Sequence, residues 1–448
     1  MVMSTVRIML AVGLQKRGVR FHQLDIVSAY STALCTREIF VHYPPGRLCP
    51  RGPGYCMRTI KALYGVVDLG RLFYDEWIQY HLDLDFQPIH SDKCYLMYYK
   101  GPDEFIRICF HVDDNIISQI GDELWTWYQA SLKVKYELSL KPLHYCMGIE
   151  FAIDYERGII KMTQVAQIEK MLRDLQMENC RPARSPVSSS AQPSLEEIEP
   201  RPSEQTLRFP MMAFLGHLNC LQQGTRPDIT RALKIASKFG TKFGAVHIEW
   251  VKRIVRYLAG NKSIGIVYRR VPAELANHKQ IFPDATHASD PDTRRSISGV
   301  SIKLAGNLVL WKANFQKIVS HSSTESEIMC LDVSGTLGQY AKWICIAVGI
   351  PPIMPIPIFL DSQSSIDIMK NPIQAGRNLH IHARYFYMRD HVVDQEYALV
   401  KIATEDQISD VLVTFKDFPT FHRLRYLLLH CAFVEMVDGT ASWNTMYL

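Results

Sequence analysis

The sequence predicts a mixed chain, in which an α+β region is followed by a helical segment and then by an α/β region. Three observations support this fold class. Two apolar runs flank a pair of aspartates near residue 113, which is typical of a β-hairpin. A Ser-, Pro- and Glu-rich stretch at 185–205 has no aromatic residue and predicts a linker. After residue 280, several strands come first and then alternate with helices, as in a sheet covered by helices.

Composition bounds the class of protein. The 448 residues leave room for two or three domains, and the apolar fraction of 47% is that of a globular protein. A net charge of +5 indicates a nucleic-acid partner only weakly, since binding depends on local basic patches. The eleven cysteines are scattered and form no Cys-x-x-Cys pair, which disfavours a disulfide scaffold or zinc site and suits a reducing compartment. No apolar run reaches eighteen residues, so no transmembrane segment is expected.

The first half is expected to begin with a helix over residues 4–15 and a strand over 20–26, which brings Asp25 close to the strand's end. Apolar residues at helical spacing predict a helix over 71–84. The hairpin follows at 105–120, with a turn at 113–115.

The N-terminal residues 1–15 allow two interpretations. Their apolar pattern fits an amphipathic helix that packs on the first strand. It also resembles a short secretion signal, although no small-x-small cleavage site follows.

The second half is predicted to be helical over 210–258, with a break at Pro227, which suits a helix start. The α/β region that follows has a longer list of expected elements. Strands are expected at 281–285, 298–304, 308–311, 358–360 and 398–402, and helices at 324–348, 362–369, 383–393 and 406–413.

Asp25, Asp113 and Asp114 could form one metal site. Three carboxylates that converge from a strand and a hairpin would repel each other unless a divalent cation holds them, and oxygen ligands favour Mg²⁺. Nucleotidyl transfer requires such acids to hold two ions about 4 Å apart. The alternative is an ordinary acidic surface turn.

A second set of acids lies at strand ends and on helix faces, where side chains from different elements can meet above a sheet edge. Its members are Asp284, Glu327, Asp361 and Asp410. Each also has an ordinary interpretation. Glu327 and Asp410 could be solvated surface acids, and Asp361 could cap the helix that follows it.

Several motifs resemble the Pol polyprotein of copia-type LTR retrotransposons, over about residues 4–428. In the first half they are Phe21-His-Gln-Leu-Asp25-Ile-Val-Ser-Ala-Tyr30 and Phe110-His-Val-Asp-Asp114. In the second half they are Asp290-Pro-Asp-Thr-Arg-Arg-Ser-Ile-Ser-Gly299, Ser320-His-Ser-Ser-Thr-Glu-Ser-Glu327, Phe359-Leu-Asp-Ser-Gln363 and Thr404-Glu-Asp-Gln-Ile-Ser-Asp410.

This resemblance implies the domain organisation. Residues 1–184 would form a partial, palm-like reverse transcriptase domain that lacks the N-terminal fingers. A linker at 185–206 and a helical connection at 207–270 would lead to a ribonuclease H-like mixed-sheet domain at 280–430. The tail at 431–448 is left unassigned.

The resemblance also implies roles for particular residues. Asp25, Asp113 and Asp114 would hold two Mg²⁺ ions for RNA-directed DNA synthesis. A second pair of Mg²⁺ ions, for cutting RNA in a hybrid, would be held by Asp284, Glu327, Asp361 and Asp410. Tyr30, Arg71, Arg294 and Arg295 would contact substrate. The partners would be an RNA/DNA hybrid and dNTPs, in the cytoplasm or nucleus.

Departures from the family pattern make polymerase activity doubtful. Asp68 stands where the family has a glutamine near the incoming nucleotide, and His111 replaces the hairpin tyrosine. The chain also begins just before the first catalytic strand. The alternative function is a non-catalytic, domesticated fragment that acts as a binding or interaction protein, including a pathogen effector secreted through residues 1–15.

Overall fold

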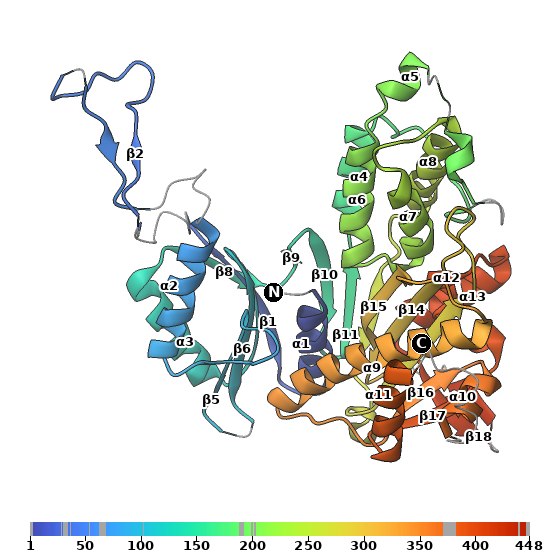
Figure 1. Cartoon of the computed structure of the whole chain (residues 1–448). Helices are drawn as coiled ribbons and strands as arrows, with labels where there is room; N and C mark the ends of the chain where they lie inside the picture. Colours follow the sequence, from blue (N-terminus) through green and yellow to red (C-terminus); the bar gives the residue numbers. More distant parts are fainter. Residues whose placement is uncertain are drawn as a thin grey trace. The chain divides into compact units, whose positions relative to one another are not determined.

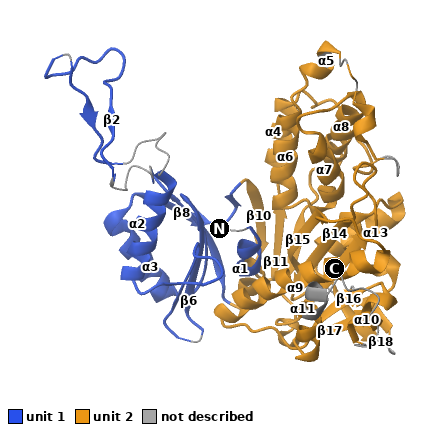
Figure 2. Cartoon of the chain, in the orientation of Figure 1, with its two compact units in different colours: residues 1–9, 18–147 blue, residues 10–17, 148–448 orange. Residues whose placement is uncertain are grey.

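A computed structural model gives the fold (Figure 1). It describes residues 3–27, 29, 35, 37–52, 54–61, 69–101, 103–187, 192–198, 200, 203–370, 382–437 and 440–444. The chain divides into two compact units, coloured separately in Figure 2. Unit 1 comprises residues 1–9 and 18–147, and unit 2 comprises residues 10–17 and 148–448. Residues 148–184, which we expected in the first domain, thus group with the second half of the chain.

Unit 1 is built on a six-stranded antiparallel sheet with the strand order β4-β5-β6-β7-β1-β8. The strands are β1 (Arg20–Ile26), β4 (Gln87–Pro88), β5 (Tyr95–Tyr99), β6 (Phe105–His111), β7 (Asp114–Ile120) and β8 (Leu138–Pro142). Helices α2 (Leu69–Asp83) and α3 (Asp122–Lys135) pack on the sheet, and β2 (Phe40–Val41) pairs with β3 (Met57–Arg58). The predicted strand at 20–26 and helix at 71–84 are confirmed.

An aromatic core joins the two helices of unit 1 to its sheet. Trp77 and Phe110 meet edge to face, and Phe86 packs against Tyr128. The buried His81 lies among them and hydrogen-bonds the Tyr128 hydroxyl at 2.9 Å. Burial lowers the pKa of His81 to about 4, so this ring is neutral and serves the core.

Helix α1 (Met3–Gln15) confirms the helix expected at 4–15. Its residues 4–14 are all buried. Thr5 donates a 2.7 Å hydrogen bond to Asp92 in unit 1, and Gln15 donates to the Arg269 carbonyl in unit 2. The segment that resembles a secretion signal is therefore an integral helix of this fold.

The first layer of unit 2 joins strands from distant parts of the sequence. Strand β11 (Ile159–Thr163) pairs with β10 (Ile149–Asp154) on one side and with β12 (Ile266–Arg269) on the other. The accompanying helices are α4 (Val165–Asp174), α5 (Glu204–Leu207), α6 (Met211–Gly224), α7 (Thr230–Ala236) and α8 (Ala245–Ala259). The predicted break falls at the short 3-10 turn η3 (Pro227–Ile229).

The second layer of unit 2 is a mixed five-stranded sheet with the order β15-β14-β13-β16-β17. Its strands are β13 (Lys279–Thr286), β14 (Ile297–Leu304), β15 (Asn307–Phe315), β16 (Ile356–Leu360) and β17 (Tyr397–Lys401). The helices are α9 (Ser323–Ala347), α10 (Gln363–Lys370), α11 (His382–Val393), α12 (Asp410–Val413) and α13 (Phe418–Leu429). The α+β and α/β class is confirmed, but the helix expected at 406–413 is reduced to the turn η8 (Thr404–Asp406) and short α12.

The tail that we left unassigned forms a hairpin of β18 (Phe433–Val437) and β19 (Thr440–Asn444). Trp443 stacks on Phe282 of the sheet at 5.3 Å between ring centroids and donates a hydrogen bond to the Asp406 carbonyl. Gln280 exchanges two hydrogen bonds with the backbone of Val434. These contacts make the hairpin part of unit 2.

The described part of the Ser/Pro/Glu segment follows the surface of unit 2. Gln192 donates to the Ser289 carbonyl, and the backbone N–H of Leu195 donates to Asp292. His247 hydrogen-bonds the Ser194 carbonyl at 3.1 Å. Polar contacts therefore hold this segment on unit 2, although it has no aromatic residue.

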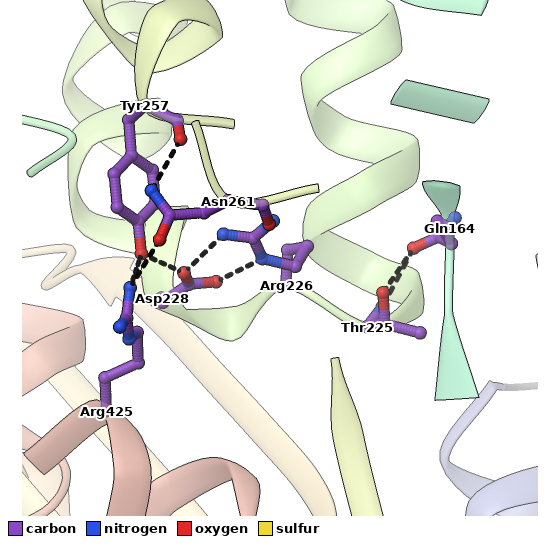
Figure 3. Close-up of polar contacts among 7 residues, drawn as sticks. All are labelled: Gln164, Thr225, Arg226, Asp228, Tyr257, Asn261 and Arg425. Atoms are coloured by element: carbon purple, nitrogen blue, oxygen red, sulfur yellow. Dashed lines mark hydrogen bonds and ion pairs between the residues drawn. The ribbon is translucent and has the colours of Figure 1, made fainter. Parts of the chain in front are cut away.

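A buried polar network links the turn η3, α8 and α13 (Figure 3). The Arg226 guanidinium binds both Asp228 carboxylate oxygens, at 3.0 and 2.8 Å. The Tyr257 hydroxyl donates to Asp228 at 2.5 Å and accepts from Arg425 at 2.7 Å. This network fixes helix α13 against the helical layer of the same unit.

Candidate functional site

The register of the mixed sheet brings Asp284 and Asp361 to the same level. Strands β13 and β16 run parallel, with Ile281 opposite Ile358. Each aspartate lies three residues further along its own chain segment. Parallel neighbours at equal positions project their side chains to the same face. The strand order therefore explains why acids 77 positions apart in sequence meet.

Glu327 reaches these aspartates from the first turns of α9. The helix begins where the Ser322 hydroxyl accepts the Glu325 N–H at 3.1 Å, while the Glu325 carboxylate accepts the backbone N–H of His321. Ser322 is the N-cap residue, and the two contacts together fix the start of the helix. The Glu327 carboxylate accepts the backbone N–H of Ala285 at 3.3 Å, which ties it to the residue after Asp284.

Asp284, Glu327 and Asp361 form an acid cluster whose ligand oxygens all lie within 4.8 Å of one another. Within the part of the chain that the structure describes, no other group of three potential ligands is this close. Asp284 and Glu327 are 5% and 7% exposed, and each has one buried carboxylate oxygen without a hydrogen-bond partner. Unpaired buried oxygens are costly, and a divalent cation would satisfy them.

The fourth predicted acid, Asp410, begins α12 and lies beside Asp284 but outside this three-acid group. Its carboxylate is 2.7 Å from the Lys416 ammonium. Gly299, which pairs with Asp284 across β13 and β14, makes this approach possible. A Cβ at position 299 would lie 2.4 Å from the Val413 side chain, so a larger residue would push α12 away.

The electrostatics of the acid cluster favour protons when no cation is bound. Burial, and then the neighbouring acids Asp410, Glu327 and Asp361, raise the pKa of Asp284 well above its ordinary value. Burial and Asp361 raise the pKa of Glu327 to about 8, against the opposing effect of the Ala285 N–H. A cation that binds here must therefore displace protons, and its affinity is expected to rise with pH.

The raised pKa of Glu327 predicts how metal-free stability depends on pH. The folded protein binds a proton at Glu327 up to about pH 8, whereas the unfolded chain releases it near pH 4.5. The free energy of unfolding should therefore fall as pH rises between these values. Glu327→Gln removes this contribution, so urea unfolding in EDTA from pH 5 to 8 should show a shallower decline for the variant. Equal slopes for both proteins would contradict the prediction.

The first predicted acid set gathers in unit 1 more loosely. Leu24 of β1 pairs with Asn115 of β7, so Asp25 and Asp114 face each other one step further along the ladder. Burial, Asp113 and then Asp25 raise the pKa of Asp114. Asp25 itself is exposed, and the carboxylate oxygens of the three acids do not all lie within 4.8 Å of one another.

The hairpin turn that presents these acids falls earlier than we predicted. Strand β6 ends at His111 and β7 starts at Asp114, so the turn is Val112-Asp113 rather than 113–115. Val112 has φ +60°, a conformation that strains a β-branched residue. Asn115 offsets part of this strain by donating a 2.7 Å hydrogen bond to the Asp113 carbonyl.

The predicted substrate-binding residues that the structure describes, Arg71, Arg294 and Arg295, contact residues outside the two acid sets. Tyr30 and Asp68 lie outside the described residues. Arg71 forms an exposed ion pair with Asp75 at 3.5 Å. Arg294 and Arg295 close a turn on Asp290 through their backbone atoms.

Three residues that we did not predict shape the acid cluster. Besides Gly299 and Lys416, Arg231 of α7 is 4% exposed and lies over the Phe415 ring. Burial lowers the pKa of Arg231 to about 10, while Asp284 and then Asp290 oppose this effect. Gly299 closes one of the sequence motifs, but its role and those of Lys416 and Arg231 depend on tertiary approaches that the sequence does not indicate.

Unit 2 thus has a mixed sheet with acids at its strand ends, and unit 1 has acids on a hairpin. In the described part of the chain, no helix has the length and apolar character needed to cross a bilayer. Residues 1–189 match the family model described as reverse transcriptase (RNA-dependent DNA polymerase). Over most of its length the chain is similar to copia-type retrotransposon Pol polyproteins.

Curated relatives extend the similarity over most of the chain. The retrovirus-related Pol polyprotein from transposon RE1 of Arabidopsis thaliana is 29% identical over 415 residues, which is 91% of this chain and 27% of that protein. The one from transposon TNT 1-94 of Nicotiana tabacum is 26% identical over 395 residues, 87% of this chain and 29% of that protein. The chain thus spans somewhat over a quarter of these relatives. Secreted RxLR effector protein 161 of Plasmopara viticola is 33% identical over 138 residues, 31% of this chain and 92% of that protein.

Proposed function

We propose that unit 2 is a metal-dependent nuclease that cuts the RNA strand of an RNA/DNA hybrid. The observation that supports this most directly is the acid cluster, in which buried oxygens of Asp284 and Glu327 lack partners. Hard carboxylate ligands fit Mg²⁺. When bound, such an ion supplies Lewis acidity and a water nucleophile at neutral pH.

The chain's own residues have separate tasks in this proposal. Asp284 and Asp361 hold fixed oxygens at two adjacent strand ends, where β-sheet hydrogen bonds limit their movement. Glu327 closes the cluster from α9, and its bond to the Ala285 N–H sets its orientation. The Lys401 ammonium contacts the Asp361 carbonyl and adds positive charge beside a site that would receive a phosphate.

We further propose that Asp25, Asp113 and Asp114 hold ions for RNA-directed DNA synthesis in a palm-like unit 1. The antiparallel pairing of β1 with β7 supports this by placing Asp25 opposite Asp114. Tyr30 and Arg71 would then contact dNTP and template. Asp68 and the exposed His111 depart from the family pattern, so we expect polymerase activity to be much weaker than nuclease activity.

Hybrid cleavage tests the nuclease proposal. The full chain with Mg²⁺ should cut the RNA strand of a labelled hybrid and leave double-stranded DNA intact, and EDTA should stop the reaction. Asp361→Asn should lose cleavage, because it weakens one of the three converging ligands. Asp367→Asn is the matched control, since Asp367 is an exposed acid of α10 that contacts Gln363. If the folded wild-type protein leaves the hybrid uncut, the nuclease proposal is wrong.

Primer extension tests the polymerase proposal separately. We expect little or no extension of a DNA primer on RNA by the wild-type chain with Mg²⁺ and dNTPs. Any extension that does occur should disappear in Asp113→Asn and persist in Asp361→Asn, because the two acids belong to different units. Extension that survives Asp113→Asn would exclude the proposed role of the hairpin.

A second candidate is a non-catalytic binding or interaction protein. It draws support from the similarity of 138 residues to a protein named as a secreted effector. The secreted version requires removal of residues 1–15, and the burial of helix α1 argues against that step. Tight hybrid binding without cleavage would favour the non-catalytic candidate.

A further inference from the structure

We propose that Lys416 acts as a built-in cation at Asp410, so that the acid cluster takes one divalent ion readily and a second only weakly. The readily bound ion would use Asp284, Glu327 and Asp361, and the weakly bound one would use Asp410. This inference rests on the proposed metal centre and adds an order of loading to it.

The contact between Lys416 and Asp410 is close and largely shielded from water. The ammonium nitrogen lies 2.7 Å from the carboxylate, and the two side chains are 21% and 6% exposed. An ion pair that is this close and this well shielded from water is screened less than an exposed one. Lys416 therefore holds the position next to Asp410 that a second divalent ion would otherwise take.

Among the described residues, no lysine, arginine or histidine forms an ion pair with the side chains of Asp284, Glu327 or Asp361. Asp284 and Glu327 each keep a buried carboxylate oxygen without a hydrogen-bond partner. Their ligand atoms and one of Asp361 lie within 4.8 Å of one another, whereas Asp410 is not part of this group. The expected difference in affinity between the two ion positions thus follows from the arrangement of the side chains.

Arg231 adds a second positive charge near Lys416. Both side chains line one small cavity, together with Phe415, which lies under the guanidinium. The Nε and Nη1 atoms of Arg231 are buried and without hydrogen-bond partners. A divalent ion at Asp410 would therefore have to displace Lys416, whereas the charge of Arg231, which also acts on Asp284, opposes cation binding at both positions.

Metal titration of the full chain tests this order of loading. Mn²⁺ serves as the probe, and electron paramagnetic resonance measures the free ion at each addition. The wild-type protein should bind one ion and then a second at least about tenfold more weakly. In Lys416→Met the second ion should bind about tenfold or more tightly than in wild type, and Lys416→Arg should behave as wild type.

Two further variants define the outcome. Lys342→Met is the matched control, because Lys342 pairs with Glu396 in the same unit at 3.2 Å, and it should leave both ions unchanged. Asp410→Asn should remove the weak ion and keep the first. If thermal melting shows that Lys416→Met is unfolded, Lys416→Gln replaces it.

The results separate this inference from the proposed function. If the first ion binds as expected and the variants at Lys416 leave the second unchanged, the metal centre stands and the role of Lys416 is wrong. Two equally tight ions in wild type would also overturn the inference. If no Mn²⁺ binds to wild type or to Lys416→Met, the metal centre itself fails, and the inference fails with it.

Discussion

Asp284→Asn is expected to lower hybrid cleavage by at least about a hundredfold, because residues that merely support metal ligands already contribute about 10–100-fold. Asp284 is the acid that lies next to all three others, as the causes of its raised pKa show. Its replacement should weaken the first ion through loss of a charged ligand. The second ion should weaken too, because Asp284 lies beside Asp410.

The same variant should make the metal-free protein more stable at high pH. Burial and three neighbouring acids raise the pKa of Asp284, so its ionisation in the folded state is unfavourable. The folded protein therefore loses stability as pH rises toward that raised pKa, and an asparagine does not. Thermal melting in EDTA should show a gap in favour of Asp284→Asn that widens as pH rises above the ordinary aspartate pKa of 3.8.

These opposite effects distinguish a metal ligand from a structural acid. Asp367→Asn again serves as the control, and it should change neither cleavage nor the melting temperature. If Asp284→Asn lowered both cleavage and metal-free stability, its loss of activity would reflect damage to the fold. In that case the cluster would not be a cation site.

The sequence predicts the members of the acid cluster that local patterns mark, but not the residues that act through contacts between distant segments. Asp284 and Asp361 were predictable because each ends a short apolar strand, and Glu327 because it opens a long helix. The roles of Lys416 and Gly299 were not predictable, although Gly299 closes one of the sequence motifs. Their importance comes from the approach of α12 to β14, which no local pattern encodes.

The same limit explains the differences in domain organisation. Residues 148–184 group with unit 2 because β11 pairs with β12, whose residues come about a hundred positions later. The tail hairpin was missed because its strands are short and its anchor is one tryptophan, Trp443, that stacks on Phe282. Local propensity gives the elements, but pairings over such separations need the folded structure.

Asp228→Asn is expected to destabilise unit 2 by about 3–5 kcal/mol, the usual cost of breaking a buried ion pair from one side. Both side chains of the Arg226–Asp228 pair are fully buried. The variant leaves the Arg226 charge without its partner and weakens the hydrogen bond from Tyr257. Since Arg425 reaches the network through the Tyr257 hydroxyl, α13 should loosen with it.

Urea unfolding followed by circular dichroism measures this effect against two controls. Glu204→Gln removes an exposed ion pair with Arg208, and its cost should stay below about 1 kcal/mol. Replacing Arg226 and Asp228 together with apolar residues should cost less than Asp228→Asn alone, because no unpaired charge remains. A double variant less stable than the single one would show that the network contributes through its shape rather than its charge.

The pH dependence of Asp228→Asn gives an independent check. Despite full burial, which acts to raise it, the pKa of Asp228 is lowered, because the Arg226 charge and its hydrogen bonds outweigh the burial. A carboxylate with a lowered folded pKa contributes stability above its unfolded pKa of about 4 and loses it as pH falls below that value. The difference between wild type and Asp228→Asn should therefore be constant from pH 5 to 8 and shrink only in stronger acid. If the stability difference between the two proteins already vanished at pH 6, Asp228 would not be ionised in the folded protein. Its contact with Arg226 would then be a hydrogen bond to a neutral acid and not an ion pair.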